Sequence, residues 1–153
     1  MDKSYRKNVA AIVLNNSGNI LLCERSDIPN AWQVPQGGID EGEGVEEALL
    51  RELEEEIGNK DVEIIDRLPY TIKYDWPEEL HRNGYCGQEQ IYFLVSLKDE
   101  NKIDLEANDE HQEFVSFEWV SLEVFFERVS SFKKDAYKKA MSDFLERNPE
   151  KIR

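Results

Sequence analysis

The chain has 153 residues, of which 40% are hydrophobic and 34% are charged, and its formal net charge is −14. We expect one domain spanning residues 1–153, because this length and apolar content suffice for a sizeable core. The negative charge argues against broad binding along a nucleic-acid backbone, and no apolar run approaches the length of a membrane span.

The N-terminal residues MDKSYRKN lack the hydrophobic region of a signal peptide. Cys23 and Cys86 have no CxxC or His-rich spacing, which favours free thiols in a reducing compartment over a zinc site. We therefore expect a cytoplasmic protein that does not contact a membrane. Residues 128–153 hold eight Lys or Arg against four Asp or Glu. This basic segment is either a solvated helix face or a local anchor for a phosphate chain.

Apolar or alternating runs predict strands along the chain, and clusters of Gly, Pro and Asn between them predict turns. Strands are expected at residues 8–14, 20–24, 32–34, 62–67, 70–74, 91–97 and 113–120, with a further short strand around 103–105. Residues 75–88 contain Pro77 and two glycines, and we expect them to form a loop that can line a site.

Two helices are expected in the last third of the chain, at residues 122–128 and 134–147. The longer one has an apolar inner face formed by Tyr137, Met141, Phe144 and Leu145. Together with an acidic helix described below, this mixture of strands and helices indicates one sheet sandwiched between helices.

Residues 37–59, GGIDEGEGVEEALLRELEEEIGN, combine a glycine-rich turn with that acidic helix. The helix has an apolar stripe that recurs every four residues, at Val45, Leu49, Leu53 and Ile57, and this stripe is expected to dock on the core. Gly58 is placed to end the helix. The glycines of the turn allow tight folding, which brings main-chain groups close to a ligand.

Glu52, Glu55 and Glu56 fall on one face of the helix, at positions i, i+3 and i+4. Like charges at this spacing repel, at a cost of about 0.2–0.5 kcal/mol per pair in an isolated helix. A divalent cation removes the repulsion, because carboxylate oxygens converging from one face make a Mg²⁺ or Mn²⁺ site. The plainer alternative is a solvated acidic helix surface.

This segment resembles the Nudix box. The matching positions are Gly37, Glu43, Arg51, Glu52, Leu53, Glu55, Glu56 and Gly58, and only Asn59 replaces an aliphatic residue. The resemblance implies an α/β protein with the Nudix α/β/α sandwich, in which a mixed β-sheet lies between helices. It also implies Mg²⁺-dependent hydrolysis of phosphoanhydride bonds, with Mn²⁺ as a possible substitute. Glu52, Glu55 and Glu56 would be metal ligands and one of them the general base, with the main chain of Gly37 beside them.

Other charged residues are expected to support this acidic face. Arg51 is expected to pair with Glu47 or Glu55 and hold the glutamates in position, although a plain surface ion pair would have the same signature. Glu43 can reach back to a backbone amide and brace the loop. Glu113 is a further candidate metal ligand, because the family often supplies a carboxylate well after the box; a solvent-exposed side chain is the alternative.

The resemblance extends to the bacterial RNA pyrophosphohydrolases, also called dinucleoside polyphosphate hydrolases. It rests on residues 5–9, 32–39, 87–90, 113–114 and 131–135, although Lys7 and Val34 replace the more common Pro and Phe. This group releases pyrophosphate from 5′-triphosphorylated RNA, and many of its members cleave dinucleoside polyphosphates such as diadenosine tetraphosphate. The expected partners are therefore a nucleotide or the 5′ end of RNA, and not DNA.

The same resemblance implies a set of substrate-binding residues. Arg6 would contact the phosphate chain, Arg25 and Phe132 would stack on a base, and Lys133 would hold a phosphate. Stacking of this kind contributes about 1–3 kcal/mol per base without demanding a particular base. The remaining expected contacts are Gln36, Gly37, Gly38, Tyr74, Gln88 and Gln90. The plainer alternatives are a core position for Phe132 and surface charges for Arg25 and Lys133.

Two other functions are compatible with the sequence. One is hydrolysis of small nucleoside diphosphate derivatives such as ADP-ribose or oxidised dNTPs. The other is a non-catalytic module that binds nucleotide or RNA, although every glutamate of the box is present. The sequence leaves open the preferred polyphosphate, the number of metals, the identity of the base, and whether the chain is a monomer or a dimer.

Overall fold

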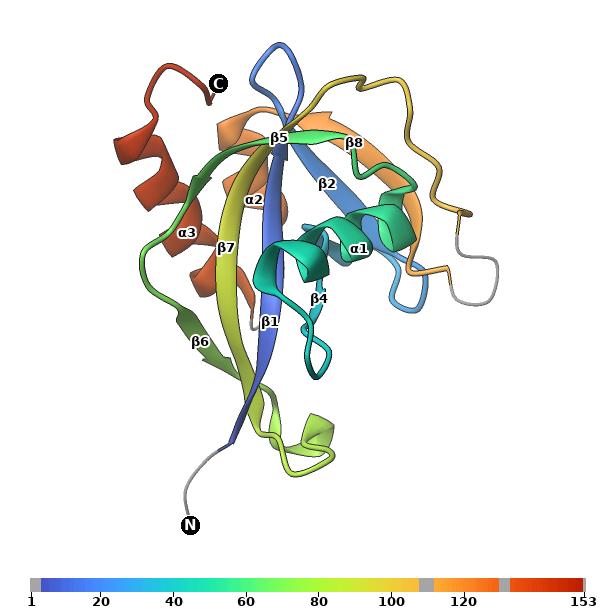
Figure 1. Cartoon of the computed structure of the whole chain (residues 1–153), viewed down its shortest axis with the longest axis vertical. Coiled ribbons are helices and arrows are strands. Elements are labelled where there is room, and N and C mark those ends of the chain that lie inside the picture. Colours follow the sequence, from blue (N-terminus) through green and yellow to red (C-terminus); the bar gives the residue numbers. More distant parts are fainter. Residues whose placement is uncertain (1–3, 108–111, 130–132, 153) are drawn as a thin grey trace.

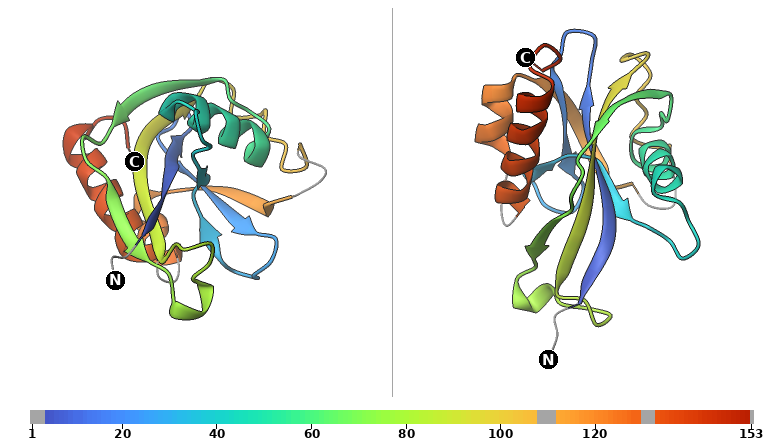
Figure 2. Two further views of the ribbon diagram at one scale, coloured as in Figure 1. Left: turned by 60° about the horizontal axis from the view of Figure 1, so that its bottom comes forward. Right: turned by 60° about the vertical axis from the view of Figure 1, so that its left-hand side comes forward.

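The computed structural model describes residues 4–107, 112–129 and 133–152. In these residues one mixed sheet lies between helix α1 on one face and helices α2 and α3 on the other (Figures 1 and 2). The strands are β1 Tyr5–Leu14, β2 Ile20–Arg25, β3 Trp32–Gln33, β4 Gln36–Gly38, β5 Val62–Arg67, β6 Ile72–Asp75, β7 Gly87–Leu97 and β8 Phe114–Val120. The helices are α1 Val45–Ile57, α2 Leu122–Arg128 and α3 Lys134–Arg147, with a 3-10 turn η1 at Glu78–Leu80. None of these helices is long and apolar enough to cross a membrane.

Strand β1 is at the centre of the sheet. It runs parallel to β7 along its whole length and pairs antiparallel with β4 through Asn8↔Gly38, Val9↔Gly37 and Ala10↔Gln36. The far end of β1 joins β2, which also pairs with β3 and β8, whereas β7 also pairs with β5 and β6. This arrangement brings the glycine-rich turn that precedes α1 against the middle of the sheet.

The alternation of β1 separates two apolar cores. Ala10 and Ile12 belong to the core beneath α2 and α3, whereas Val9 and Ala11 belong to the core beneath α1. Helix α1 buries Leu49, Leu53 and Ile57, and α3 buries Tyr137, Met141 and Phe144, with Leu145 partly buried. The predicted sandwich and the predicted inner faces of both long helices are therefore confirmed.

Most predicted elements match the structure, and the helices at residues 122–128 and 134–147 match to the residue. The strand predicted at residues 8–14 starts earlier, at Tyr5, and the strand predicted at 91–97 starts earlier, at Gly87. The added residues are mostly polar but pair with each other, from Tyr5↔Gly87 to Asn8↔Gln90. The short strand β4 was not predicted, because its three residues carry no apolar pattern.

The short strand predicted around residues 103–105 is wrong. Ile103 and Leu105 instead pack against the core beneath α1, and Asp104 donates its main-chain N–H to Ile57 O at 2.8 Å. Asn59 fastens the same segment, because its side-chain amide donates to Lys102 O at 3.0 Å and its Oδ1 accepts from Asp61 N at 2.8 Å. A buried asparagine at the unusual box position thus ties the end of the helix to this segment.

Helix α1 ends at Gly58, as predicted. Gly58 has a φ of +69° and donates its N–H to Glu54 O at 3.0 Å. A Cβ atom at this position would lie 2.7 Å from Asp104 O. Gly42, in the turn before the helix, has a similar φ of +79°, but a Cβ atom there would meet nothing within 4 Å.

These two glycines give a matched test of the contact between α1 and residue 104. We expect Gly42→Ala to lower the free energy of unfolding by about 1–2 kcal/mol, the cost of a left-handed conformation for a residue with a Cβ atom. Gly58→Ala should lower it by clearly more, because the new methyl group also displaces Asp104. Urea denaturation of both variants measures the difference. Equal losses would contradict the close approach at Gly58.

Candidate active site

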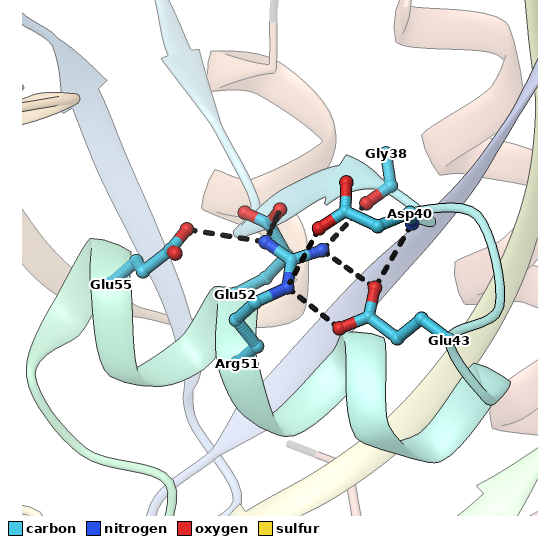
Figure 3. Close-up of polar contacts among 6 residues, drawn as sticks. All are labelled: Gly38, Asp40, Glu43, Arg51, Glu52 and Glu55. Atoms are coloured by element: carbon cyan, nitrogen blue, oxygen red, sulfur yellow. Dashed lines mark hydrogen bonds and ion pairs between the residues drawn. The ribbon is translucent and has the colours of Figure 1, made fainter.

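Arg51 on helix α1 organises the acidic residues of the site (Figure 3). Its guanidinium contacts Glu43 through two nitrogens, at 2.7 and 2.9 Å, and donates to Glu52 Oε1 at 2.8 Å. It also donates to Gly38 O at 2.8 Å and to Glu55 Oε2 at 3.3 Å. Asp40 Oδ2 lies 3.6 Å from Arg51 Nε. Arg51 therefore links helix α1 to the preceding turn and holds four carboxylates around one cation.

Glu43 braces the turn before the helix. Its Oε1 accepts the main-chain N–H of Asp40 at 3.0 Å, which confirms the predicted contact with a backbone amide. The Arg51 hydrogen bonds, together with this N–H, lower the pKa of Glu43 to about 2. Of the two predicted partners of Arg51, the structure confirms Glu55, and Glu43 stands in place of Glu47.

Glu52 and Glu56 form a buried carboxyl pair. Glu56 is only 6% exposed, and burial, followed by its hydrogen bond and charge interaction with Glu52, raises its pKa well above the ordinary value. Burial also raises the pKa of Glu52, although the hydrogen bond and the charge of Arg51 lower it. The charge of Glu52 therefore disfavours a second charge on Glu56. A hydrogen bond with the main chain of Gln36 favours the charged form of Glu56.

The carboxylates of the site leave room for a divalent cation. Among the described residues, no three acidic, His or Cys side chains are already gathered as a ligand set. Glu55, whose side chain is 45% exposed, contacts Arg51. However, Glu56 Oε2 is buried without a hydrogen-bond partner. A hard cation fits there, because it would neutralise the neighbouring carboxylates and occupy this oxygen.

Gly37 leaves the room that Glu52 needs. A Cβ atom on Gly37 would overlap the carboxyl group of Glu52, so any larger residue would displace it. Likewise, a Cβ atom on Gly38 would overlap the guanidinium of Arg6. The two glycines therefore bring the main chain of β4 against one anionic and one cationic side chain.

A cleft of about 690 Å³ opens beside these glycines. Most of the predicted substrate-binding residues line it, together with the predicted metal ligand Glu113: Arg6, Arg25, Gln36, Gly37, Gly38, Gln88, Glu113 and Lys133. Glu113 raises the pKa of Glu56 through its charge, so the two carboxylates lie close enough to interact. The structure thus brings the acidic helix face and a set of cations from distant parts of the chain to one place.

The cations of the cleft are held by neighbouring polar groups. Arg25 donates to both carboxylate oxygens of Asp27, at 2.8 and 2.6 Å. Lys133 Nζ donates to Gln33 Oε1 at 2.8 Å, and burial lowers the pKa of Lys133 to about 8. A lysine with this pKa is still mostly charged at neutral pH, and an anion in the cleft would favour its charged form.

Two predicted binding residues, Gln90 and Tyr74, are not among the described residues that line the cleft. Gln90 is fully buried; it donates to Asn8 Oδ1 at 2.9 Å and accepts from the hydroxyl of Tyr92 at 2.6 Å. Tyr74 is 8% exposed in the core beneath α3, and burial raises its pKa to about 12. Phe132 lies outside the described residues. Gln90 and Tyr74 therefore lie behind the wall of the cleft.

Sequence reasoning missed the groups that support Gln36. The hydroxyl of Tyr137 donates to Gln36 Oε1 at 2.7 Å, and Gln90 donates to the same oxygen at 3.3 Å. Tyr137 was predicted only as an apolar residue of the inner face of α3. The available signal was its hydroxyl, because a tyrosine in a core position needs a polar partner.

Comparison with known proteins agrees with the fold. The model of the NUDIX domain matches residues 4–143. An RNA pyrophosphohydrolase of Campylobacter jejuni is 46% identical over 152 residues, covering 95% of this chain and 96% of the relative. An RNA pyrophosphohydrolase of Helicobacter pylori is 43% identical, covering 94% and 96%.

A solved structure of an Ap4A hydrolase of C. elegans, a binary complex, superposes with a TM-score of 0.68 at 22% identity, covering 92% of this chain and 97% of that one. This likeness bears on the fold alone. The family model and the two relatives cover nearly the whole chain, and the Arg51 cluster occupies the segment that carries the Nudix box. The chain belongs to the Nudix family.

Proposed function

We propose that this protein is a cytoplasmic, Mg²⁺-dependent pyrophosphohydrolase that acts on the 5′-triphosphate end of RNA, with dinucleoside polyphosphates as additional or main substrates. The observation that carries the proposal is the junction at Gly37 and Gly38. There, a buried carboxyl pair on one side meets a cleft lined by Arg6, Arg25 and Lys133 on the other. The names of the relatives that match nearly the whole chain support RNA as the substrate.

A phosphoanhydride resists attack by water because its oxygens are already negative. Bound Mg²⁺ supplies charge neutralisation, orientation of the phosphates and a lower pKa for a coordinated water. Glu52, Glu55 and Glu56 would hold it, together with Glu113 and the main chain of Gly37. Arg51 orients Glu52 and Glu55 through its hydrogen bonds. A carboxylate of this group, with its pKa raised by burial, is suited to accept the proton of the attacking water.

The cations of the cleft bind and orient the polyphosphate. Arg6 lies against Gly38, so a phosphate bound by Arg6 is next to the turn before helix α1, which carries the carboxylates. The charges of Glu56 and Glu113 favour the charged form of Lys133, so the three groups lie close enough to interact. Burial of Lys133 strengthens its interaction with an anion, because the local dielectric constant is lower than in water.

The assay that tests this function compares three substrates in Mg²⁺: 5′-triphosphorylated RNA, diadenosine tetraphosphate and ADP-ribose. We expect pyrophosphate from the RNA, with turnover of the dinucleoside compound and much slower turnover of ADP-ribose. Product analysis by ion-exchange chromatography separates the outcomes. Preferred cleavage of ADP-ribose would support the alternative of small nucleotide derivatives. Binding of all three without turnover would support a non-catalytic module.

The glutamate assignment has a matched control on the same helix. We expect Glu55→Gln and Glu56→Gln to lower kcat by about two orders of magnitude or more, because each removes an oxygen charge from the site. Glu54→Gln should leave kcat unchanged, since Glu54 is exposed and pairs with Lys60 at 3.0 Å. Circular dichroism checks that all three variants fold. Unimpaired turnover in either of the first two would remove the site assignment.

Lys133 gives a prediction about pH. Because burial lowers its pKa to about 8, its charge is present below this pH and is lost as the pH rises through it. We expect kcat/KM for triphosphate RNA to fall over the same range, since kcat/KM reports the pKa values of the free enzyme. Lys133→Arg keeps its charge and should shift this decline to higher pH. Identical profiles for the two proteins would show that another group causes the decline.

A further inference from the structure

The hydroxyl of Tyr137, on helix α3, reaches the segment that carries strand β4. Tyr137 is fully buried in the core beneath α2 and α3, and its hydroxyl donates to Gln36 Oε1 at 2.7 Å. Burial raises the pKa of Tyr137, and a hydrogen bond between the same hydroxyl and the main chain of Val34 opposes this rise. A phenylalanine would fill the core equally well, whereas a buried hydroxyl is costly unless it is paired. Packing alone therefore does not explain a tyrosine here.

The side-chain amide of Gln36 is engaged at both ends. Its Oε1 accepts from Tyr137 and also from Gln90 Nε2 at 3.3 Å, and its Nε2 makes a longer contact with the hydroxyl of Tyr74 at 3.5 Å. Although Gln36 lines the cleft, its amide is thus held from the side of α3 and β7. These contacts fix the position of the Gln36 main chain as well.

The same stretch of main chain reaches helix α1, which lies on the opposite face of the sheet from α3 (Figure 2). A hydrogen bond from the main chain of Gln36 favours the charged form of the buried Glu56. The next residue, Gly37, lies so close to the carboxyl group of Glu52 that a Cβ atom there would overlap it. A displacement of β4 would therefore change the surroundings of both carboxyl groups at once.

We propose that Tyr137 is a positioning residue for the buried pair of Glu52 and Glu56, which it holds from the far side of the sheet through Gln36 and the main chain of β4. Its consequence for metal binding rests on the proposed function, in which these carboxylates bind Mg²⁺. The hydroxyl fixes where the main-chain N–H of Gln36 points, and this N–H orients Glu56. Hydrogen bonds that orient ligands in this way affect metal affinity almost as strongly as the ligands themselves.

The test compares Tyr137→Phe with Tyr92→Phe as a matched control. Tyr92 is also fully buried in the core beneath α2 and α3, and its hydroxyl donates to Gln90 Oε1 at 2.6 Å. Each variant removes one buried hydroxyl and keeps the ring, so both should lower the free energy of unfolding to a similar extent. In Tyr92→Phe the amide of Gln90 stays in place, because its Nε2 still donates to Asn8 Oδ1 at 2.9 Å. Urea denaturation verifies the match.

The first measurement is hydrogen exchange at the main-chain amide of Gln36, followed by NMR without metal. We expect Tyr137→Phe to accelerate this exchange about tenfold, because a net contribution near that of one hydrogen bond no longer holds the N–H toward Glu56. Tyr92→Phe should leave the exchange at Gln36 as it is in the parent protein. The comparison separates a local loosening of β4 from a general loss of stability.

The second measurement is binding of Mn²⁺, followed by electron paramagnetic resonance of the free ion. We expect Tyr137→Phe to raise the Kd about tenfold, the lower end of what the loss of an orienting hydrogen bond costs, and Tyr92→Phe to match the parent. Where triphosphate RNA is turned over, kcat of Tyr137→Phe should fall at low Mg²⁺ and recover as Mg²⁺ is raised. KM for the RNA should change little, because the cations of the cleft are unaltered.

A double variant checks the route of the effect. If Tyr137 acts through Gln36, adding Tyr137→Phe to Gln36→Leu should raise the Kd for Mn²⁺ by less than Tyr137→Phe alone does, since coupled residues are not additive. Fully additive effects would show another route and overturn the inference.

Unchanged exchange at Gln36 or an unchanged Kd in Tyr137→Phe would equally overturn it, as would equal effects of Tyr137→Phe and Tyr92→Phe. A parent protein that binds no Mn²⁺ would instead defeat the proposed function. The exchange at Gln36 would then still decide whether Tyr137 positions the carboxyl pair.

Discussion

The contact of Arg51 with four carboxylates, those of Asp40, Glu43, Glu52 and Glu55, is the interaction on which the site depends. Without it, Glu43, Glu52 and Glu55 would face one another around the turn with no compensating charge, and like charges at these spacings destabilise a helix. Hydrogen bonding to Glu43, ahead of the Glu52 contact, raises the pKa of Arg51 still further. The arginine therefore stays charged, and its fifth contact, with Gly38 O, joins the helix to strand β4. The orientation of the acidic face follows from this single side chain.

Strand β4 connects this acidic face to the opposite core. The Gln36 side chain is held from the α3 side by Tyr137, and its main chain reaches Glu56 on the α1 side. Gln90 joins the same group from β7, and Asn8 accepts from Gln90 on β1. Because buried polar groups are costly unless all are paired, this network fixes the position of β4 relative to both layers. The carboxylates are thus held by the core of the whole sandwich.

The sequence predicted the local features well because local patterns determine them. The stripe of α1, its end at Gly58 and the bounds of α2 and α3 all follow from periodicity and turn residues. The burial of Tyr74 and Gln90 could not be predicted, because the burial of a residue on a strand depends on which layer covers that face, which only the tertiary structure defines. Likewise, the spacing of the glutamates put them on one face, but the rotamer of Glu55 depends on Arg51.

The cations gathered in the cleft explain how a protein with a net negative charge would bind a polyanion. The net charge of −14 opposes broad attachment to nucleic acid, yet four cations from different elements line one cleft: Arg6, Arg25, Arg82 and Lys133. The low-dielectric walls of the cleft focus the electrostatic field of these cations. The field therefore favours a chain end, which can enter the cleft, over the middle of a chain, which cannot. On the proposed RNA substrate, few phosphates would be contacted at once, and affinity would depend on the 5′ end itself. Acidity outside the cleft would thereby add to selectivity for that end.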